Sequence, residues 1–251
     1  MKNIFILFCI ISMSATDIYS QGILELLREG RSLEASANEE EALKVFLSVL
    51  ERSPNNHEAL WNVSFLYSRI GHRKENHEVK VRYFNKAKDY AEQALRINPR
   101  NEQSNYVMAV AMGRMALISG ARDRVAASRD IKKYAEQTLE ANTEHAGGHH
   151  VMGLWHYRMA NLSWSERNAA RILFGGIPEG ASDEDAIYHL NKAVDLEPGF
   201  LLYQYDLADV YIKLENKNQA KEILKNLLNL PNKTADDPKI KKDAQELLNS
   251  L

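Results

Sequence analysis

Aromatic and basic residues recur together along this sequence. In four places an aromatic or imidazole ring is followed eight residues later by a basic side chain: Trp61 and Arg69, Tyr106 and Arg114, His150 and Arg158, Tyr205 and Lys213. Arginine is suited to carboxylates and phosphates, and aromatic side chains add contact area at low entropic cost. A surface that carries all four pairs would bind an acidic peptide segment, a C-terminal carboxylate or an anionic lipid headgroup.

A structural interpretation of the same residues is equally open. The rings would then pack between neighbouring helices, and the basic side chains would pair with local aspartates and glutamates, as surface charges commonly do. The spacing alone does not choose between a ligand groove and ordinary packing.

The segment "EHAGGHHVMGLWH" (144–156) contains four histidines: His145, His149, His150 and His156. Zinc can be bound by histidines that lie one or two helical turns apart. Gly147 and Gly148 fall at the expected start of a helix, however, so His145 and His149 are not held on one helical face. We therefore expect surface and core histidines and no metal site.

Motifs for catalysis do not occur in the sequence. It contains no glycine-rich phosphate loop ending in Gly-Lys-Ser, no His-Glu-x-x-His and no Gly-x-Ser-x-Gly. Asp183, Glu184 and Asp185 suggest acid–base chemistry, but at the start of an expected helix they are better explained as partners of the helix dipole. We expect no enzymatic activity, no catalytic residues and no cofactor.

An internal repeat determines where all these residues lie. Four segments carry small or apolar residues at steps of four, three and five: Ala42, Phe46, Val49, Pro54; Ala87, Ala91, Ala94, Pro99; Ile131, Ala135, Thr138, Thr143; Ala186, Leu190, Ala193, Pro198. A fifth set comprises Ala220, Leu224 and Leu227, with Pro231 one position early. Such steps place side chains on one helical face. Upstream of each set, a partner helix has one small residue: Gly30, Ser64, Ala109, Gly153 or Ala208.

This spacing resembles the tetratricopeptide repeat, a two-helix unit that stacks into a solenoid. We predict an all-α fold, a right-handed α-solenoid in a single domain over residues 21–251. Its five repeats would span residues 23–54, 57–99, 102–143, 146–198 and 201–231, and a capping helix would span 237–250. Asp237 is the expected N-cap of that last helix, with Pro238 at its first position.

The first helices of such repeats line the concave face, and the four aromatic–basic pairs fall on them. We therefore predict one groove with an aromatic column and a basic column. The carboxylate clamp of the repeat family is not supported. Asn62 occupies one of its Lys and Asn positions, but Leu27, Gln103 and Val107 occupy others.

Repeats two, three and four carry insertions of eleven, ten and twenty-one residues between their helices. The first two insertions indicate lengthened second helices. The third includes "NLSWSERNAARILFGGIP" (161–178), which predicts a short extra helix over about 164–174. Ser163 and Glu166 fit a capping box at its start, Gly175 ends it, and Ser182 caps the helix that follows.

Two surfaces of this inserted helix are of interest. Trp164, Arg167, Arg171 and Phe174 would form an amphipathic element that touches a membrane. We favour the alternative, in which an apolar stripe of Ala169, Ile172 and Leu173 packs on adjacent helices, because one short helix adds little membrane affinity.

The inserted segment and its flanks carry a set of motif residues: Gly153, Trp155, Asn161, Ser163, Trp164, Glu166, Arg167, Phe174, Gly175 and Pro178. In these positions the chain resembles the regulator of microtubule dynamics family, and the resemblance extends over roughly residues 55 to 250. It implies a tetratricopeptide-like repeat fold. Eukaryotic members associate with microtubules, mitochondria or organelle contact sites, and one is linked to phospholipid binding through its repeat domain.

The N-terminal segment differs from those relatives. "MKNIFILFCIISMSATDIYS" has an early Lys2 and an apolar run from Ile4 to Met13, about half of the roughly 20 residues that a bilayer crossing needs. We predict a signal peptide over residues 1–20, with a retained anchor as the alternative, and a periplasmic or secreted, bacterial-looking protein. Cys9 is the single cysteine, so the cleaved chain would have no disulfide and no thiolate site.

The sequence as a whole predicts an exported, non-enzymatic scaffold that binds a partner protein or an acidic peptide segment in its concave groove. A lipid-binding or lipid-carrier protein that uses the same groove is the alternative. The formal net charge of −2 argues against nucleic-acid binding. In an exported protein we do not expect microtubule binding. The oligomeric state is not predicted.

N-terminal sequencing of the exported protein tests the signal peptide. We expect Gln21 as the first residue, because cleavage after Ser20 follows the polar exit of the apolar run; cleavage after Ala15 is the second choice. An intact Met1 or Lys2 would contradict cleavage.

Overall fold

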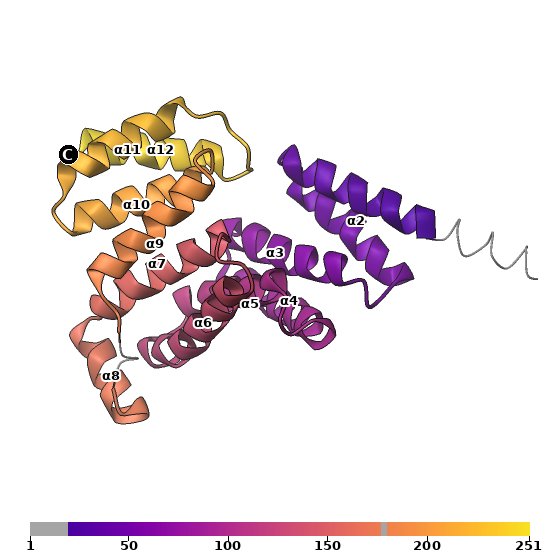
Figure 1. Cartoon of the computed structure of the whole chain (residues 1–251), viewed down its shortest axis with the longest axis horizontal. Helices are drawn as coiled ribbons and strands as arrows, with labels where there is room; N and C mark the ends of the chain where they lie inside the picture. The colour runs from indigo at the N-terminus through magenta and orange to yellow at the C-terminus, as the bar shows by residue number, and fades with distance from the viewer. Residues whose placement is uncertain (1–19, 177–179) are drawn as a thin grey trace, which may run out of the picture.

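The computed structural model describes residues 20–176 and 180–251. Residues 1–19, which include most of the expected signal peptide, and residues 177–179, which include Pro178, lie outside the described part. Within the described ranges the regular elements are all helices, arranged as successive antiparallel pairs that curve into a solenoid (Figure 1). The prediction of an all-α solenoid of helix pairs is confirmed.

A helix over residues 20–35 opens the described chain. The others are α2 Glu39–Arg52, α3 His57–Arg73, α4 His77–Ile97, α5 Glu102–Leu117, α6 Ala121–Ala141, α7 Ala146–Ala160, α8 Trp164–Phe174, α9 Asp183–Leu196, α10 Leu201–Lys213, α11 Lys217–Asn229 and α12 Asp237–Asn249. The two helices of repeat four are α7 and α9, which pack against each other with α8 inserted between them in the sequence. The last helix, α12, covers α10 and α11.

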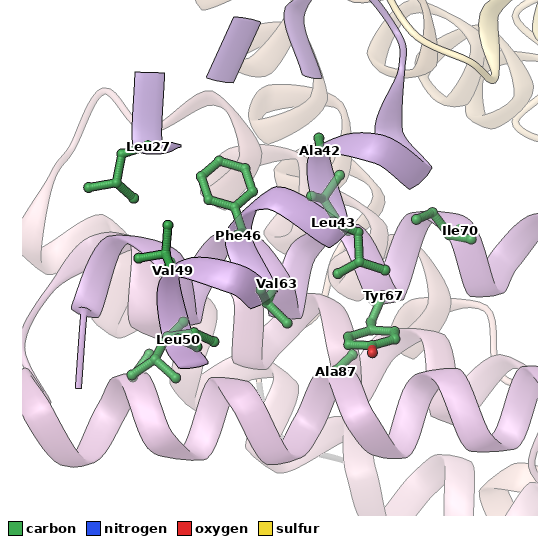
Figure 2. Close-up of a cluster of buried hydrophobic side chains, with 14 of the residues drawn as sticks. Leu27, Ala42, Leu43, Phe46, Val49, Leu50, Val63, Tyr67, Ile70 and Ala87 are labelled. Atoms are coloured by element: carbon green, nitrogen blue, oxygen red, sulfur yellow. The ribbon is translucent and has the colours of Figure 1, made fainter. Parts of the chain in front are cut away.

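The repeated positions form the core of each helix pair. The second position of the pattern is fully buried in all five repeats, at Phe46, Ala91, Ala135, Leu190 and Leu224. Figure 2 shows Phe46 among side chains of the first helix, α2 and α3, including Leu27 and Val63. The repeated sequence step therefore places the same position of the pattern in the core of every helix pair.

Small residues on the first helices set how closely each pair approaches. A Cβ atom at Gly30 would lie 2.7 Å from the Phe46 ring, and one at Gly153 would lie 2.6 Å from Cγ of Leu190. In repeat two the Ser64 hydroxyl instead donates a hydrogen bond to the carbonyl of Ala87 across the pair, at 2.7 Å.

Helix ends follow the expected capping chemistry. The Ser163 hydroxyl and the Glu166 carboxylate form a complete capping box at the start of α8, and Gly175 ends that helix in the left-handed conformation with φ of 71°. Ser182 accepts a hydrogen bond from the amide of Asp185 and so caps α9.

The expected N-cap of α12 was placed one residue too late. Asp236 is the N-cap, and its side chain makes no capping hydrogen bond. The Asp237 carboxylate is buried and accepts hydrogen bonds from the amides of Lys233 and Thr234 in the preceding turn. The amides of that turn supply hydrogen bonds to the Asp237 carboxylate, so the Asp236 side chain is available for another partner.

The expectation that the apolar stripe of α8 packs on adjacent helices is wrong for Ile172, which is 77% exposed. Trp164, at 80%, is also exposed. The contact between α8 and α6 is made on the opposite side of the helix, where Ala170 is fully buried and Glu166 pairs with Arg124 at 2.8 Å. Ala170 and one ion pair thus hold α8, and Trp164 and Ile172 face outward.

Two helical glycines provide a matched test of this close approach. Gly153→Ala should lower the free energy of unfolding by about 1–3 kcal/mol, because its Cβ would press on Leu190 and on the Ala186 carbonyl. Gly113→Ala, within α5, has no atom within 4 Å of its Cβ and should raise that free energy by about 0.5–1 kcal/mol. Urea denaturation measures both. Equal effects would contradict the role given to Gly153.

Candidate ligand groove

The predicted groove residues come from successive first helices. Trp61, Tyr106, His150 and Tyr205 are each the fifth residue of their helix, in α3, α5, α7 and α10. These helices contact one another in order, α3 with α5, α5 with α7 and α7 with α10. Side chains on one helix therefore reach those on the next, which is the condition for a continuous inner surface.

The aromatic positions are filled by interlocking rings. Tyr106 lies 5.6 Å from the ring of Phe65 and 4.7 Å from that of His145, and Gly147 leaves room for it. Burial raises the pKa of Tyr106 to about 12, although a hydrogen bond with Tyr203 opposes the shift. Tyr106 is thus an uncharged hydroxyl in the middle of the inner surface.

His150 continues this inner surface on α7. Its Nε2 lies 2.7 Å from Oδ2 of Asp206, and its ring lies 4.6 Å from that of Tyr203. The other two expected rings pack elsewhere: Trp61 contacts the cores around α3 and α4, and Tyr205 lies in the cluster formed by α10, α11 and α12.

Two inner-surface residues, Tyr203 and Asp206, were missed by the sequence reasoning. Tyr203 is the third residue of α10, and repeats two to four have a small residue at that position, Ala59, Ser104 or Gly148. The large ring of Tyr203, at a position where the other repeats have a small residue, was the feature of the sequence that could have indicated its role. Asp206 is the only acid at the sixth position of these helices, next to the aromatic column.

The four basic residues fall into two classes. The Nη2 atom of Arg69 lies 2.5 Å from Oε1 of Glu39, and Nζ of Lys213 lies 2.6 Å from Oδ2 of Asp209. Within the described residues, Arg114 and Arg158 make no ion pair and no side-chain hydrogen bond. The paired residues fit the structural interpretation, whereas the other two do not.

Arg114 and Arg158 lie on α5 and α7, two of the first helices of the repeats. Burial lowers the pKa of both guanidinium groups, and the field of Asp206 opposes the shift in each case. Arg114 is half-buried and Arg158 is exposed, so both remain open to solvent.

The histidines gather elsewhere, between α7 and α9. The Nδ1 atoms of His149 and His189 lie 2.8 Å apart, and His156 stacks on His189 with ring centroids 5.5 Å apart. Nε2 of His149 lies 3.0 Å from the Thr143 carbonyl. His145 lies outside this group. It is the N-cap of α7, and its Nδ1 accepts a hydrogen bond from the amide of Gly148.

His189 was missed because its position relative to α7 depends on how α7 and α9 pack. The described residues contain no group of three side chains arranged to hold a metal ion. The rings of His149, His156 and His189 contact one another between α7 and α9.

The motif residues brace the inserted helix. Trp155 is buried and donates from Nε1 to the Ser128 carbonyl of α6 at 2.8 Å. Arg167 donates to the Leu162 carbonyl, and the Asn161 amide donates to Asp183 at 2.6 Å. Phe174 ends α8, and Pro178 lies outside the described residues. These contacts are structural and lie apart from the groove.

A family profile described as "Regulator of microtubule dynamics protein 1-3" matches residues 26–251. The chain belongs to this family. It is 28% identical over 189 residues to regulator of microtubule dynamics protein 3 of Bos taurus, covering 75% of this chain and 40% of that protein. It is 26% identical over 196 residues to protein 2 of Homo sapiens, covering 77% and 47%. The chain thus spans about half the length of the curated relatives it matches.

A solved structure supports the fold. A thermophilic tetratricopeptide-repeat protein of Thermus thermophilus superposes with a TM-score of 0.65 at 19% identity, covering 89% of this chain and 99% of that one. At this identity the likeness concerns the fold alone. In the described part of the chain, no helix combines the length and apolarity that a membrane crossing needs.

The histidine cluster predicts a pH-dependent stability. Burial lowers the pKa of His149, His156 and His189, that of His189 to about 4 from an ordinary value of 6.5. Below pH 6.5 these histidines bind protons in the unfolded chain, whereas in the folded chain they stay unprotonated. The free energy of unfolding should therefore fall from pH 6.5 towards pH 4.

The variant His189→Asn should flatten this dependence, because it removes the most strongly shifted histidine of the cluster. Urea denaturation at several pH values measures the slope. Substitution of the exposed His77 by Gln is the control and should leave the slope unchanged. A slope that His189→Asn does not alter would contradict the assignment.

Proposed function

We propose that this protein is a non-enzymatic repeat scaffold that binds an acidic segment of a partner protein along its inner groove. The tetratricopeptide-like fold and membership of the regulator of microtubule dynamics family support a protein-interaction scaffold. The binding mode is the proposal: arginine side chains on the first helices bind carboxylates, and neighbouring rings supply contact area.

The observation that carries this proposal is that Arg114 and Arg158 have no direct partner among the described residues. A guanidinium group presents five donors, and no side chain of the described residues engages those of Arg114 or Arg158, so they are available to a ligand. The fixed carboxylate of Asp206 interacts with both arginines through space, while its Oδ2 lies 2.7 Å from His150. An incoming carboxylate would supply the missing hydrogen bonds.

A lipid carrier is the second candidate, and the same arginines would suit a phosphate headgroup. Acyl chains, however, need a deep apolar channel, and the inner surface is occupied by the hydrogen-bonded pairs Tyr106 with Tyr203 and His150 with Asp206. A pocket of about 450 Å³ between α4, α5 and α6 is lined by four charged side chains, Lys88, Glu92, Arg96 and Asp130, together with Leu95, Met108, Met112 and Tyr134. These features favour a peptide.

The proposal places the scaffold outside the cytoplasm, in the periplasm or the medium, on the basis of the expected signal peptide. The partner would then be an exported or surface protein. We therefore do not extend to this chain the microtubule role in the names of its relatives.

Binding of a short fluorescent Glu-rich peptide, followed by anisotropy, tests the groove. The double variant Arg114→Ala, Arg158→Ala should weaken binding about ten-fold or more, because two charged hydrogen-bonding groups are lost. Lys213→Ala is the matched control. Its ammonium group already pairs with Asp209, so the affinity should change by no more than about two-fold.

Two further results would distinguish the candidates. A Lys-rich peptide should not bind, and binding of the Glu-rich peptide should weaken with added salt. Unchanged affinity in the double variant would contradict the groove. Co-purified phospholipid, detected by mass spectrometry and lost in the double variant, would favour the lipid carrier instead.

A further inference from the structure

The two ends of the solenoid meet at one carboxylate. Asp236 lies in the connection between α11 and α12, and this connection reaches towards α2 and α3 (Figure 1). Its Oδ1 accepts a hydrogen bond from Nη1 of Arg73 at 3.2 Å, and its Oδ2 lies 3.9 Å from Nε of Arg69. Arg73 and Asp236 are 163 positions apart in the sequence. We call Arg69, Arg73, Glu39 and Asp236 the clasp.

The two acids of the clasp hold the arginines very differently. Glu39 is almost fully buried and lies 2.5 Å from Arg69 and 2.6 Å from Arg73, one oxygen to each. The Asp236 side chain is 25% exposed, makes longer contacts and comes from a connecting segment. Glu39 therefore orients both guanidinium groups, while the partly buried Asp236, at longer distances, is the more readily exchanged partner.

The clasp is continuous with the groove. Arg69 is one of the groove residues, and its guanidinium lies 5.5 Å from the centre of the Phe65 ring, which in turn contacts Tyr106. Asp236 interacts electrostatically with Arg114, which has no direct partner in the described part of the chain. The Asp236 carboxylate thus lies at the end of the same basic surface that the proposed acidic ligand would occupy.

Arginines supply the positive charge at this end. His72 lies in the fields of Arg114, Asp236 and Arg73, and burial, followed by Arg114, lowers its pKa to about 4. It is therefore uncharged at neutral pH. A carboxylate that arrives here meets guanidinium groups that an internal carboxylate already engages.

We propose that Asp236 occupies a carboxylate subsite of the groove, formed by Arg69 and Arg73, and that an acidic ligand displaces it and opens the clasp. This inference rests on the proposed function and describes how binding would be regulated. The connection between α11 and α12 competes with the partner for Arg69 and Arg73. Arg69 and Arg73 then contact the ligand, next to Arg114 and Arg158.

The variant Asp236→Asn tests the competition. It removes the charge and keeps a residue type that is well suited to the N-cap of α12. The Glu-rich peptide should bind about two- to five-fold more tightly than to the unsubstituted protein, as expected for the loss of one ionic competitor with long contacts. Asp195→Asn makes the same charge change at an exposed site on α9 and should have a much smaller effect.

A distance measurement reports the opening directly. Cys9 is the single cysteine, so in a Cys9→Ser background spin labels can be attached to cysteines that replace the exposed Lys44 on α2 and Lys242 on α12. The distance distribution between the labels should shift to larger values when the peptide binds, and also in Asp236→Asn without peptide.

The outcomes separate the two proposals. If the peptide binds with equal or lower affinity to Asp236→Asn, or if the label distance does not change on binding, the displacement is contradicted and the groove is not. If neither the unsubstituted protein nor Asp236→Asn binds the peptide, the proposed function is contradicted and the displacement with it. An effect of Asp195→Asn as large as that of Asp236→Asn would also overturn the subsite.

Discussion

The close approach of the two helices within each repeat is the constraint on which the rest of the structure depends. A small residue on the first helix faces a buried position on the second, as at Gly30 with Phe46 and Gly153 with Leu190. This contact sets the distance between the helices of a pair and so the angle at which the next pair is added. The inner surface, where the first helices follow one another, is a consequence of that repeated geometry.

Insertions are tolerated because they enter where this contact is not affected. The extra residues of repeats two and three lengthen the second helices, to 21 residues in both α4 and α6. The longest insertion adds α8, which rests on α6 through the buried Ala170 and the pair of Arg124 with Glu166. None of these additions interrupts the contacts of α3 with α5, α5 with α7 and α7 with α10.

Local periodicity explains what the sequence predicts well. The steps of four and three, the capping box at Ser163 and the cap at Ser182 depend on residues that are near in the chain, and the structure has them as expected. Tyr203, His189 and Asp236 act through partners 40 or more residues away, or through helices that meet only after stacking. Their roles depend on the curvature of the solenoid, which no single segment encodes.

The division of the basic residues into paired and unpaired classes has a physical explanation in that curvature. The packing of α2 on α3 brings Glu39 to Arg69 and Arg73, and the approach of the C-terminal connection adds Asp236, so these cations are neutralised by the chain itself. Arg114 and Arg158 lie further inside, where Asp206 favours their charge from a distance but makes no ion pair with them. The field of Asp206 thereby favours both charges, and no side chain of the described residues engages their donors. Such an arrangement is preorganised for an anion, because binding then requires little further ordering of the protein.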